Sequence, residues 1–231
     1  MSLAHAIGHE LALPPILHIT PIVFVVDEDA SVRESLDWLI RCEGWQPETF
    51  ASAQEFLVRP RAFVPSCLVL DVSLPDFSAL DLQQRVVAER SDMPVIFLSA
   101  HGDVPTTVRA MKAGALEFLM KPFRQDVLLS AIREAIDRSR AALDHQEELR
   151  GLRERYSSLT NRERQVMALV VSGLLNKQVG GELGISEITV KAHRGKMMQK
   201  MKADSIADLV KMDVKMRFAG SAIRMLSRAT Q

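Results

Sequence analysis

The chain has 231 residues, enough for one large domain or two ordinary ones, and 47% of them are hydrophobic and 25% charged. Its two cysteines form neither a disulfide framework nor a metal site, and no apolar stretch reaches the ~18 residues that a membrane span needs. The N-terminus lacks the basic and apolar regions of a signal peptide, so we expect a cytoplasmic protein with no membrane partner.

The net charge is zero, but the two parts of the chain differ in charge. Residues 158–231 hold 13 Lys/Arg and 6 Asp/Glu, whereas residues 1–157 hold 16 Lys/Arg and 23 Asp/Glu. A basic C-terminal part on an acidic N-terminal part indicates a module that binds anions, joined to a second module of a different kind. The alternative is an accident of surface composition.

Residues 1–21 contain Pro14, Pro15 and Pro21 and are expected to form an extended N-terminal arm. From residue 22 to 137, short apolar runs alternate with amphipathic helical patterns. Strands are predicted at 22–26, 47–50, 67–70, 94–98 and 117–120, and helices at 30–43, 52–58, 78–90, 104–112 and 124–137. Continuously apolar runs such as Val23–Val26 are typical of parallel strands buried on both faces. The predicted fold class is therefore α/β, with a five-stranded doubly wound parallel sheet.

The helical pattern that begins at residue 124 continues to 157, past the predicted domain. Apolar residues recur along it mostly at intervals of three, four or seven, namely Leu128, Ile132, Ile136, Leu143, Leu149, Leu152 and Tyr156. Residues 138–157 are therefore predicted to be a helical linker. A short coiled coil and a solvated spacer explain the pattern equally well.

From residue 158 onward the strand signals vanish. Four helices are predicted at 161–173, 177–183, 187–202 and 205–218, which makes 158–218 an all-α domain, and 219–231 are predicted to be a basic tail. Thr160 and Glu163 have the spacing of a capping box, in which each side chain accepts a hydrogen bond from the other residue's backbone N–H.

Polar residues follow several of the predicted strands, at the point where each strand ends. Asp27 and Glu28 follow the first strand, Asp71 the third, Ser99 the fourth and Lys121 the fifth. The C-terminal ends of parallel strands meet at one edge of the sheet, which is where such folds bind ligands. Carboxylates are ligands of Mg²⁺, and a lysine offsets charge on phosphoryl oxygens. We therefore predict a divalent-cation site at which a carboxylate accepts a phosphoryl group. The alternative, for each of these residues considered alone, is an ordinary turn or cap residue.

This pattern resembles the receiver domain of two-component response regulators over residues 22–137. The matching segments are Val25–Asp29, Leu70–Pro75, Ser99–Asp103 and Glu117–Phe123. The resemblance implies a flavodoxin-like receiver, with Asp71 as the residue phosphorylated by a histidine kinase and Mg²⁺ or another divalent cation as cofactor. It also implies the remaining site residues: Asp27, Glu28, Asp71 and the backbone carbonyl of Ser73 as metal ligands, Ser99 as switch hydroxyl, Phe118 as switch aromatic, Lys121 as phosphate partner, and a cis Lys121–Pro122 bond.

Two positions depart from the receiver pattern. Glu28 stands where the family usually carries Asp, and its extra methylene is expected to shift or weaken metal coordination unless Asp29 compensates. Ala79 stands where the family usually carries Gly. If that position has a positive φ, alanine strains the turn by ~1 kcal/mol.

The basic C-terminal part has a helix–turn–helix pattern, with helices at 176–183 and 187–196 around the turn Gly184-Ile185-Ser186. Over about 60 residues it resembles the LuxR-like four-helix DNA-binding domain of NarL/FixJ-type regulators. The residues predicted to contact DNA are Lys177, Thr189, Lys191, His193, Arg194, Lys196 and Lys200. A packed or capping role is the alternative for His193.

Three further expectations concern this domain. Gly195, in the recognition helix, costs that helix roughly 1 kcal/mol of helix propensity. Gly180, in the preceding helix where alanine is usual, is expected to weaken that helix too. The resemblance also implies that the helix at 205–218 forms a dimer contact through Ile206, Leu209, Val210 and Val214; the alternative is that these residues pack on the domain's own core.

The two resemblances predict a transcription regulator that a histidine kinase switches by phosphorylating Asp71. Its partners would be promoter DNA, the kinase and a second copy of the chain after activation, and RNA polymerase is a further partner. It would not be an enzyme beyond the self-catalysed phosphoryl transfer to Asp71. One alternative is a phosphorylation-independent DNA-binding regulator whose receiver-like domain is an interaction scaffold. Another is an aspartate-nucleophile phosphatase, but such enzymes place an acid where this chain has Ser73.

Overall fold

The computed structural model describes residues 20–74, 78–100 and 104–229. It divides into two compact units, residues 1–141 and 142–231. Most of the predicted N-terminal arm lies outside the described residues, as do residues 75–77 and 101–103 of the receiver-like segments and the last two residues of the predicted tail. Within the described ranges, no helix is both long enough and apolar enough to cross a membrane.

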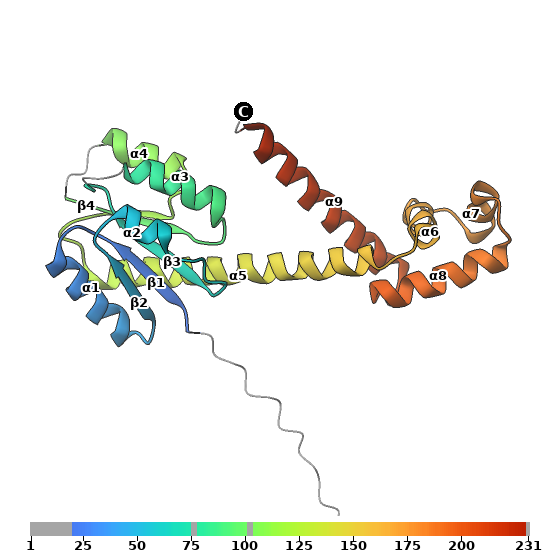
Figure 1. Ribbon diagram of the computed structural model, residues 1–231, viewed down its shortest axis with the longest axis horizontal. Coiled ribbons are helices and arrows are strands. Elements are labelled where there is room, and N and C mark those ends of the chain that lie inside the picture. The colour runs from blue at the N-terminus through green and yellow to red at the C-terminus, as the bar shows by residue number, and fades with distance from the viewer. Residues whose placement is uncertain (1–19, 75–77, 101–103, 230–231) are drawn as a thin grey trace, which may run out of the picture. The chain divides into compact units, whose positions relative to one another are not determined.

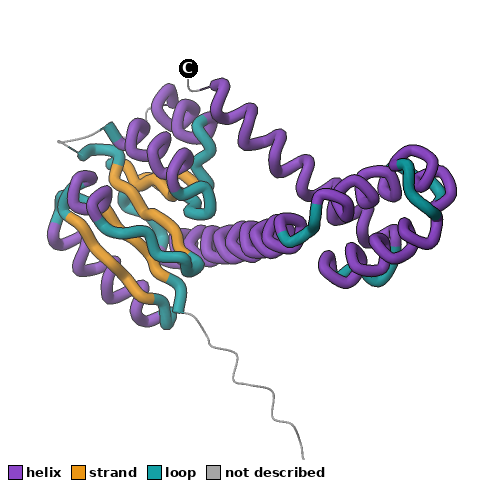
Figure 2. The backbone as a smooth tube through the Cα atoms, turned by 45° about the vertical axis from the view of Figure 1, so that its right-hand side comes forward, coloured by secondary structure: helices purple, strands orange, loops and turns teal. Residues whose placement is uncertain are grey.

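The first unit is built on a five-stranded parallel sheet of order β2-β1-β3-β4-β5 (Figure 2). Its strands are β1 (Ile22–Val26), β2 (Gln46–Phe50), β3 (Ser66–Asp71), β4 (Val95–Ser99) and β5 (Glu117–Met120). Every residue of β1, β3 and β4 is buried, as their continuously apolar sequences predict. The predicted doubly wound sheet is confirmed, and its strand order places the C-terminal ends of β1, β3 and β5 at one edge.

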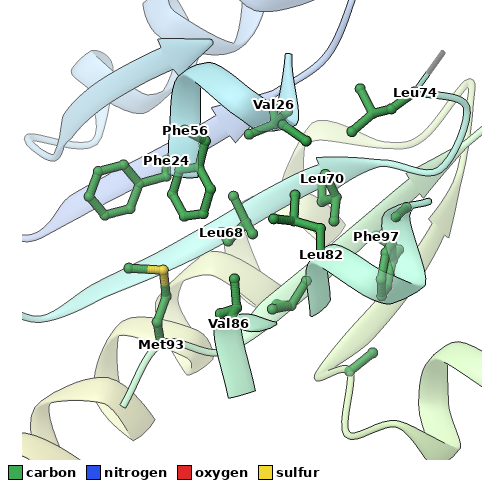
Figure 3. Packing of buried hydrophobic residues seen from close by; sticks show 14 of the residues in the cluster. Phe24, Val26, Phe56, Leu68, Leu70, Leu74, Leu82, Val86, Met93 and Phe97 are labelled. Atoms are coloured by element: carbon green, nitrogen blue, oxygen red, sulfur yellow. The ribbon is translucent and has the colours of Figure 1, made fainter. Parts of the chain in front are cut away.

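Helices cover both faces of this sheet (Figure 1). They are α1 (Ala30–Cys42), α2 (Ala53–Val58), α3 (Ala79–Glu89), α4 (Val104–Lys112) and the long α5 (Gln125–Ser157). Phe24 and Leu70 point to the face packed by α2, α3 and α4 (Figure 3), whereas Val25 and Val69 point to the face packed by α1 and α5. Alternate residues of one strand thus enter two separate cores, which is why the strands are apolar throughout.

Local hydrogen bonds fix where the first helices begin. The Asp29 carboxylate accepts a hydrogen bond from the Ser31 backbone N–H at 2.8 Å and caps α1. Ser52 caps α2 in the same way, since its hydroxyl oxygen accepts from the Glu55 N–H. Ala79 is the buried first residue of α3, and Lys202 is the one non-glycine residue with positive φ in the described ranges. The strain considered for Ala79 therefore does not arise.

The two cysteines have opposite environments. Cys67, in β3, is fully buried in the core beneath α1 and α5, and this burial raises the pKa of its thiol to about 12. Cys42 is exposed at the last residue of α1. Both thiols are free.

The second unit is all-helical, as predicted. It contains the end of α5, then α6 (Asn161–Val171), α7 (Asn176–Leu183), α8 (Glu187–Met201) and α9 (Ile206–Ala229). Its core is formed by Leu159, just before α6, and by residues of α6 to α9, chiefly Val166, Met167, Val170, Val179, Val190, Met197, Met201 and Leu209. Because α9 runs on to Ala229, the helix predicted to end at Phe218 is longer than expected, and residues 219–229 are helical.

Several of the apolar positions considered for intermolecular contacts are buried within the chain itself. Leu149 and Leu152, in the part of α5 that belongs to the second unit, are 9% and 2% exposed, so they are not free to form the seam of a coiled coil. Glu148 beside them forms an ion pair with Lys215 of α9. Leu209 of α9 is likewise buried in the unit's own core, whereas Val214 is 42% exposed.

Candidate functional site

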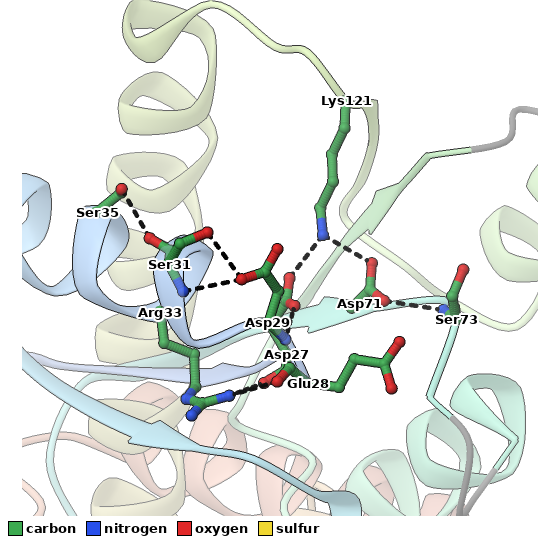
Figure 4. Close-up of polar contacts among 9 residues, drawn as sticks. All are labelled: Asp27, Glu28, Asp29, Ser31, Arg33, Ser35, Asp71, Ser73 and Lys121. Atoms are coloured by element: carbon green, nitrogen blue, oxygen red, sulfur yellow. Dashed lines mark hydrogen bonds and ion pairs between the residues drawn. The ribbon is translucent and has the colours of Figure 1, made fainter.

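Three of the predicted site residues meet at the C-terminal edge of the sheet (Figure 4). Asp27 directly follows β1, Asp71 is the last residue of β3, and Lys121 directly follows β5. The Lys121 ammonium donates hydrogen bonds to Asp27 Oδ2 at 2.6 Å and to Asp71 Oδ1 at 3.0 Å. One cation is thus shared by two carboxylates that lie 94 and 50 residues before it in the sequence.

Burial makes these contacts stronger than surface ion pairs. Asp27 is 1% exposed and Asp71 is 4% exposed, so water screens their charges little. Burial alone lowers the pKa of Lys121, but its hydrogen bonds and charge interactions with Asp27 and Asp71 more than offset this, and the pKa stands above its usual value. Lys121 is therefore protonated at neutral pH and stabilises both negative charges.

Backbone groups hold the other carboxylate oxygens. Asp27 Oδ1 accepts from the Asp29 N–H at 2.9 Å, and Asp71 Oδ2 accepts from the Ser73 N–H at 3.2 Å. Arg33 donates to the carbonyl oxygens of Asp27 and Glu28 at 2.7 and 2.9 Å, and so ties the loop after β1 to the first turns of α1. The two acids are consequently fixed in place by both backbone and side-chain donors.

The remaining acids of the predicted metal set are arranged differently. Glu28 is exposed, and its side chain points away from Lys121 (Figure 4). Asp29 is occupied as the cap of α1, so it does not compensate for Glu28. Within the described ranges, no three His, Cys, Asp or Glu side chains are grouped to hold a metal. What the edge does provide is a pair of buried carboxylates, a donor set that suits a hard cation bound largely through water.

The predicted switch residues lie beside the acid pair. Ser99 is buried at the end of β4, and its carbonyl accepts a hydrogen bond from the Lys121 N–H at 2.7 Å. Phe118, in β5, is half-buried, with its ring 6.2 Å from that of Phe97. The Lys121–Pro122 bond is cis, as the receiver resemblance implies.

In the second unit, α7 and α8 form the predicted helix–turn–helix. Gly184 ends α7 with a φ of 65°, a left-handed conformation that glycine adopts at little cost, and Ser186 caps α8 by accepting from the Thr189 N–H. Val179 of α7 and Val190 of α8 are fully buried between the helices. The two helices and the turn between them agree with the sequence prediction.

The seven residues predicted to contact DNA fall into two groups. Four are exposed, namely Lys177, Thr189, Lys191 and Lys196, and three are half-buried, namely His193, Arg194 and Lys200. Arg194 donates to the Asn176 side chain at 2.9 Å, which links α8 to the start of α7. Arg194 thus contacts another helix of the unit, whereas the partners of two of the exposed residues are local: Lys191 pairs with Glu187 on α8 and Thr189 with the Ser186 cap.

Lys200 joins a network that the charge pattern did not predict. Its ammonium donates to Glu163 Oε2 at 2.7 Å and to the Ser158 carbonyl at 3.2 Å. Glu163 is 2% exposed and forms the predicted capping box with Thr160. The pKa of Glu163 is lowered, chiefly by the hydrogen bond from Lys200 and to a smaller extent by that from the Thr160 N–H. A buried glutamate needs such a partner, but its burial is known only from the structure, so no signal in the sequence predicts this contact.

Gly180 has a structural role that differs from the expected weakening of its helix. It is buried, and a Cβ placed on it would lie 2.8 Å from the Ile185 carbonyl oxygen in the turn. Glycine is therefore what lets the turn pack closely on α7. The neighbouring Gly181 is exposed, and a Cβ there would meet nothing within 4 Å.

We expect Gly180→Ala to lower the free energy of unfolding of the second unit by about 1–2 kcal/mol, because the overpacking outweighs the gain in helix propensity. The matched variant Gly181→Ala, one residue away, should raise it by about 0.5–1 kcal/mol. Urea denaturation followed by circular dichroism measures both. Equal stabilisation by the two alanines would show that the Ile185 carbonyl does not exclude a side chain at position 180.

Comparison with known proteins identifies two family matches. Residues 23–133 match the family described as response regulator receiver domain, and residues 157–213 match bacterial regulatory proteins of the luxR family. Nodulation protein W of Bradyrhizobium diazoefficiens is 49% identical over 191 residues, covering 83% of this chain and 84% of that protein. FixJ of the same organism is 37% identical over 190 residues, covering 82% and 93%. The solved structure of the response regulator StyR has a TM-score of 0.77 and 47% identity, covering 85% of this chain and 99% of that one.

Proposed function

The chain belongs to the FixJ/NarL type of two-component response regulators, DNA-binding transcription factors that are not enzymes, and from this we propose that phosphorylation of Asp71 controls its binding to DNA. The observation that carries the proposal is the position of Lys121, whose ammonium contacts both Asp27 and Asp71 at the sheet edge. A protonated lysine beside a buried carboxylate is what a phosphoryl acceptor needs to hold the incoming charge.

In the proposed step, a carboxylate oxygen of Asp71 attacks the phosphorus of the kinase's phosphohistidine. An O–P bond to Asp71 forms while the P–N bond breaks, and the electron pair of that bond returns to the imidazole nitrogen. Lys121 contacts the phosphoryl oxygens and offsets their charge. Ser99, at the end of β4, then donates its hydroxyl to the new phosphoryl group.

Response regulator receivers typically use Mg²⁺. Here Asp27, Asp71 and the carbonyl of Ser73 would hold it, with water supplying the other ligands. When bound, the cation neutralises charge on the phosphoryl group during transfer. Glu28 is also proposed as a ligand, with weaker coordination than the usual aspartate because of its extra methylene and its exposed position.

The proposed consequence of phosphorylation is dimerisation through the face formed by α4, β5 and the start of α5. This face exposes large apolar side chains, namely Val104 at 73%, Val108 and Met111 at 43% each, Met120 at 55% and Val127 at 41%. Phe118 lies in β5, which forms part of this face, and its ring packs near that of Phe97 in the strand that ends at Ser99, so movement of the serine and the ring would link the phosphoryl group to the face. A dimer would bring two copies of α8 to two half-sites on promoter DNA.

Contact with DNA is assigned to α8 lying in the major groove. Thr189, Lys191 and Lys196 are exposed on α8, Lys177 is exposed at the start of α7, and together they supply donors for phosphates and base edges. His193 and Arg194 stay candidates at the edge of the contact, whereas Lys200 is assigned to holding Glu163. Because lysine contacts to phosphates release counterions, affinity for DNA should fall steeply with salt. RNA polymerase is proposed as a further partner on the promoter.

One observation favours a second function. Glu28, which stands where receivers usually carry Asp, is exposed, so the receiver fold would serve as a scaffold for protein contacts in a regulator that needs no phosphorylation. The two functions differ in their response to phosphate analogues.

Beryllofluoride mimics a phosphoryl group, and adding it together with Mg²⁺ distinguishes the phosphorylation switch from the scaffold. We expect the full chain to bind promoter DNA at least tenfold more tightly with both reagents than with Mg²⁺ alone, and to shift from monomer to dimer in analytical ultracentrifugation. Fluoride with Mg²⁺ but no beryllium is the control. Unchanged affinity and unchanged mass with beryllofluoride would favour the scaffold.

A further inference from the structure

The exposed face of α8 carries no charged residue along its centre. Ile188, Ala192, Gly195 and Gln199 are all exposed and follow one another at intervals of four, three and four, so they lie on one face of the helix. The buried residues of α8 are Val190, Met197 and Met201, which lie on the opposite side in the core of the unit. The lysines flank the exposed row rather than occupying it.

Ile188 is the largest apolar side chain in this row, and it is 80% exposed. It stands in the first turn of α8, directly after the Ser186 cap and Glu187, where the helix begins. A β-branched residue has a lower helix propensity than the straight-chain residues that suit an exposed helical position, and here it gains no packing within the chain. Its side chain is therefore available to a partner that reaches the start of α8.

The N-terminal residues of a recognition helix contact base edges, and in the major groove thymine alone presents a methyl group, at C5. We propose that Ile188 determines operator specificity by contacting the 5-methyl group of a thymine in each half-site. Lys191, one turn along and also exposed, contacts the neighbouring phosphates or base edges and sets the register of the helix. This inference rests on the placement of α8 in the major groove proposed above.

The methyl contact can be tested by deleting the methyl group from the DNA. An operator is first selected from a random duplex library with the full chain in Mg²⁺ and beryllofluoride, and each thymine is then replaced in turn by uracil, which lacks only that methyl. For the wild-type protein we expect one thymine per half-site at which uracil weakens binding about fourfold, the value for one buried methyl-sized group. Fluorescence anisotropy measures the affinities.

The same duplexes are then measured with Ile188→Ala. The variant should bind the thymine operator more weakly than wild type and should no longer distinguish thymine from uracil at that position, so that the two changes are not additive. Ile188→Val, which keeps a β-branched side chain, should retain part of the discrimination. Val58→Ala removes an equally exposed side chain, 82% exposed, from the first unit and should leave both affinities unchanged.

The outcomes separate this inference from the proposed function beneath it. If Lys191→Ala weakens binding but Ile188→Ala keeps the wild-type ratio of thymine to uracil affinity at every position, the methyl contact is refuted while α8 stays in the groove. If neither variant changes DNA affinity, the placement of α8 itself is wrong. If Ile188→Ala binds normally but lowers transcription with purified RNA polymerase, Ile188 contacts protein and the inference is overturned.

Discussion

Replacing Asp71 with asparagine is expected to abolish phosphorylation of the protein by acetyl phosphate in the presence of Mg²⁺. The amide has nearly the same shape, and its oxygen can still accept the hydrogen bond that Lys121 donates to Asp71 Oδ1, so the fold should be kept even though the bond from the Ser73 N–H to Oδ2 is lost. However, a neutral amide lacks the nucleophilic carboxylate oxygen that attacks phosphorus. Phosphate-affinity gel electrophoresis should show a shifted band for the wild type and none for the variant.

Asp29→Asn is the matched control for this experiment. Asp29 lies at the same sheet edge, but its carboxylate caps α1, and asparagine caps helices about as well as aspartate. This variant should be phosphorylated at the wild-type rate, and acetyl phosphate should still increase its affinity for DNA. Phosphorylation of the Asp71 variant with wild-type yield would mean that another side chain is the acceptor.

Replacing Lys121 with alanine is expected to lower the free energy of unfolding of the first unit by about 3 kcal/mol at neutral pH without metal. The change leaves Asp27 and Asp71, which are 1% and 4% exposed, without the cation that they share. Breaking a buried ion pair from one side costs about 3–5 kcal/mol, and we take the lower figure because the lysine side chain is 22% exposed and water can enter its place. Urea denaturation of the chain in EDTA measures the loss.

The same argument predicts how metal should act on this variant. With Lys121 gone, a divalent cation is the remaining positive charge for the two acids, so Mg²⁺ should stabilise Lys121→Ala more than it stabilises the wild type. Lys112→Ala, which removes an exposed lysine at the end of α4, should change stability by less than about 0.5 kcal/mol in either buffer. A Lys121 variant as stable as this control would show that the acids are not held as charged groups.

The strands and the site at their ends were predictable because each has a strong local signal. The runs Val23–Val26 and Val95–Leu98 are apolar on both faces, so they are buried between two layers of helices. A parallel sheet then brings the residues at the C-terminal ends of β1, β3 and β5 together. The meeting of Asp27, Asp71 and Lys121 follows from that topology. Predicting the strands was therefore enough to predict which charges meet.

The features that sequence reasoning missed depend on contacts between distant segments. From the sequence, Lys200 is one more positive charge on a DNA-binding helix. In the structure its ammonium forms an ion pair with the buried Glu163 at the start of α6. Gly180 looked like a weak point in α7 until the Ile185 carbonyl was seen to occupy the space of a side chain. Leu149 and Leu152 have a spacing that fits a coiled coil and a packed helix alike, and their burial within one chain decides between them.

The contrast between the two cysteines makes the sheet observable in solution. A maleimide reacts with thiolate, so at neutral pH the folded chain should be labelled at exposed Cys42 alone, because the Cys67 thiol is buried and has a pKa of about 12. Cys67 becomes reactive only when β3 leaves the core. A fluorophore on Cys42 would then report events near α1, while the slow labelling of Cys67 would time the opening of the strand that carries Asp71.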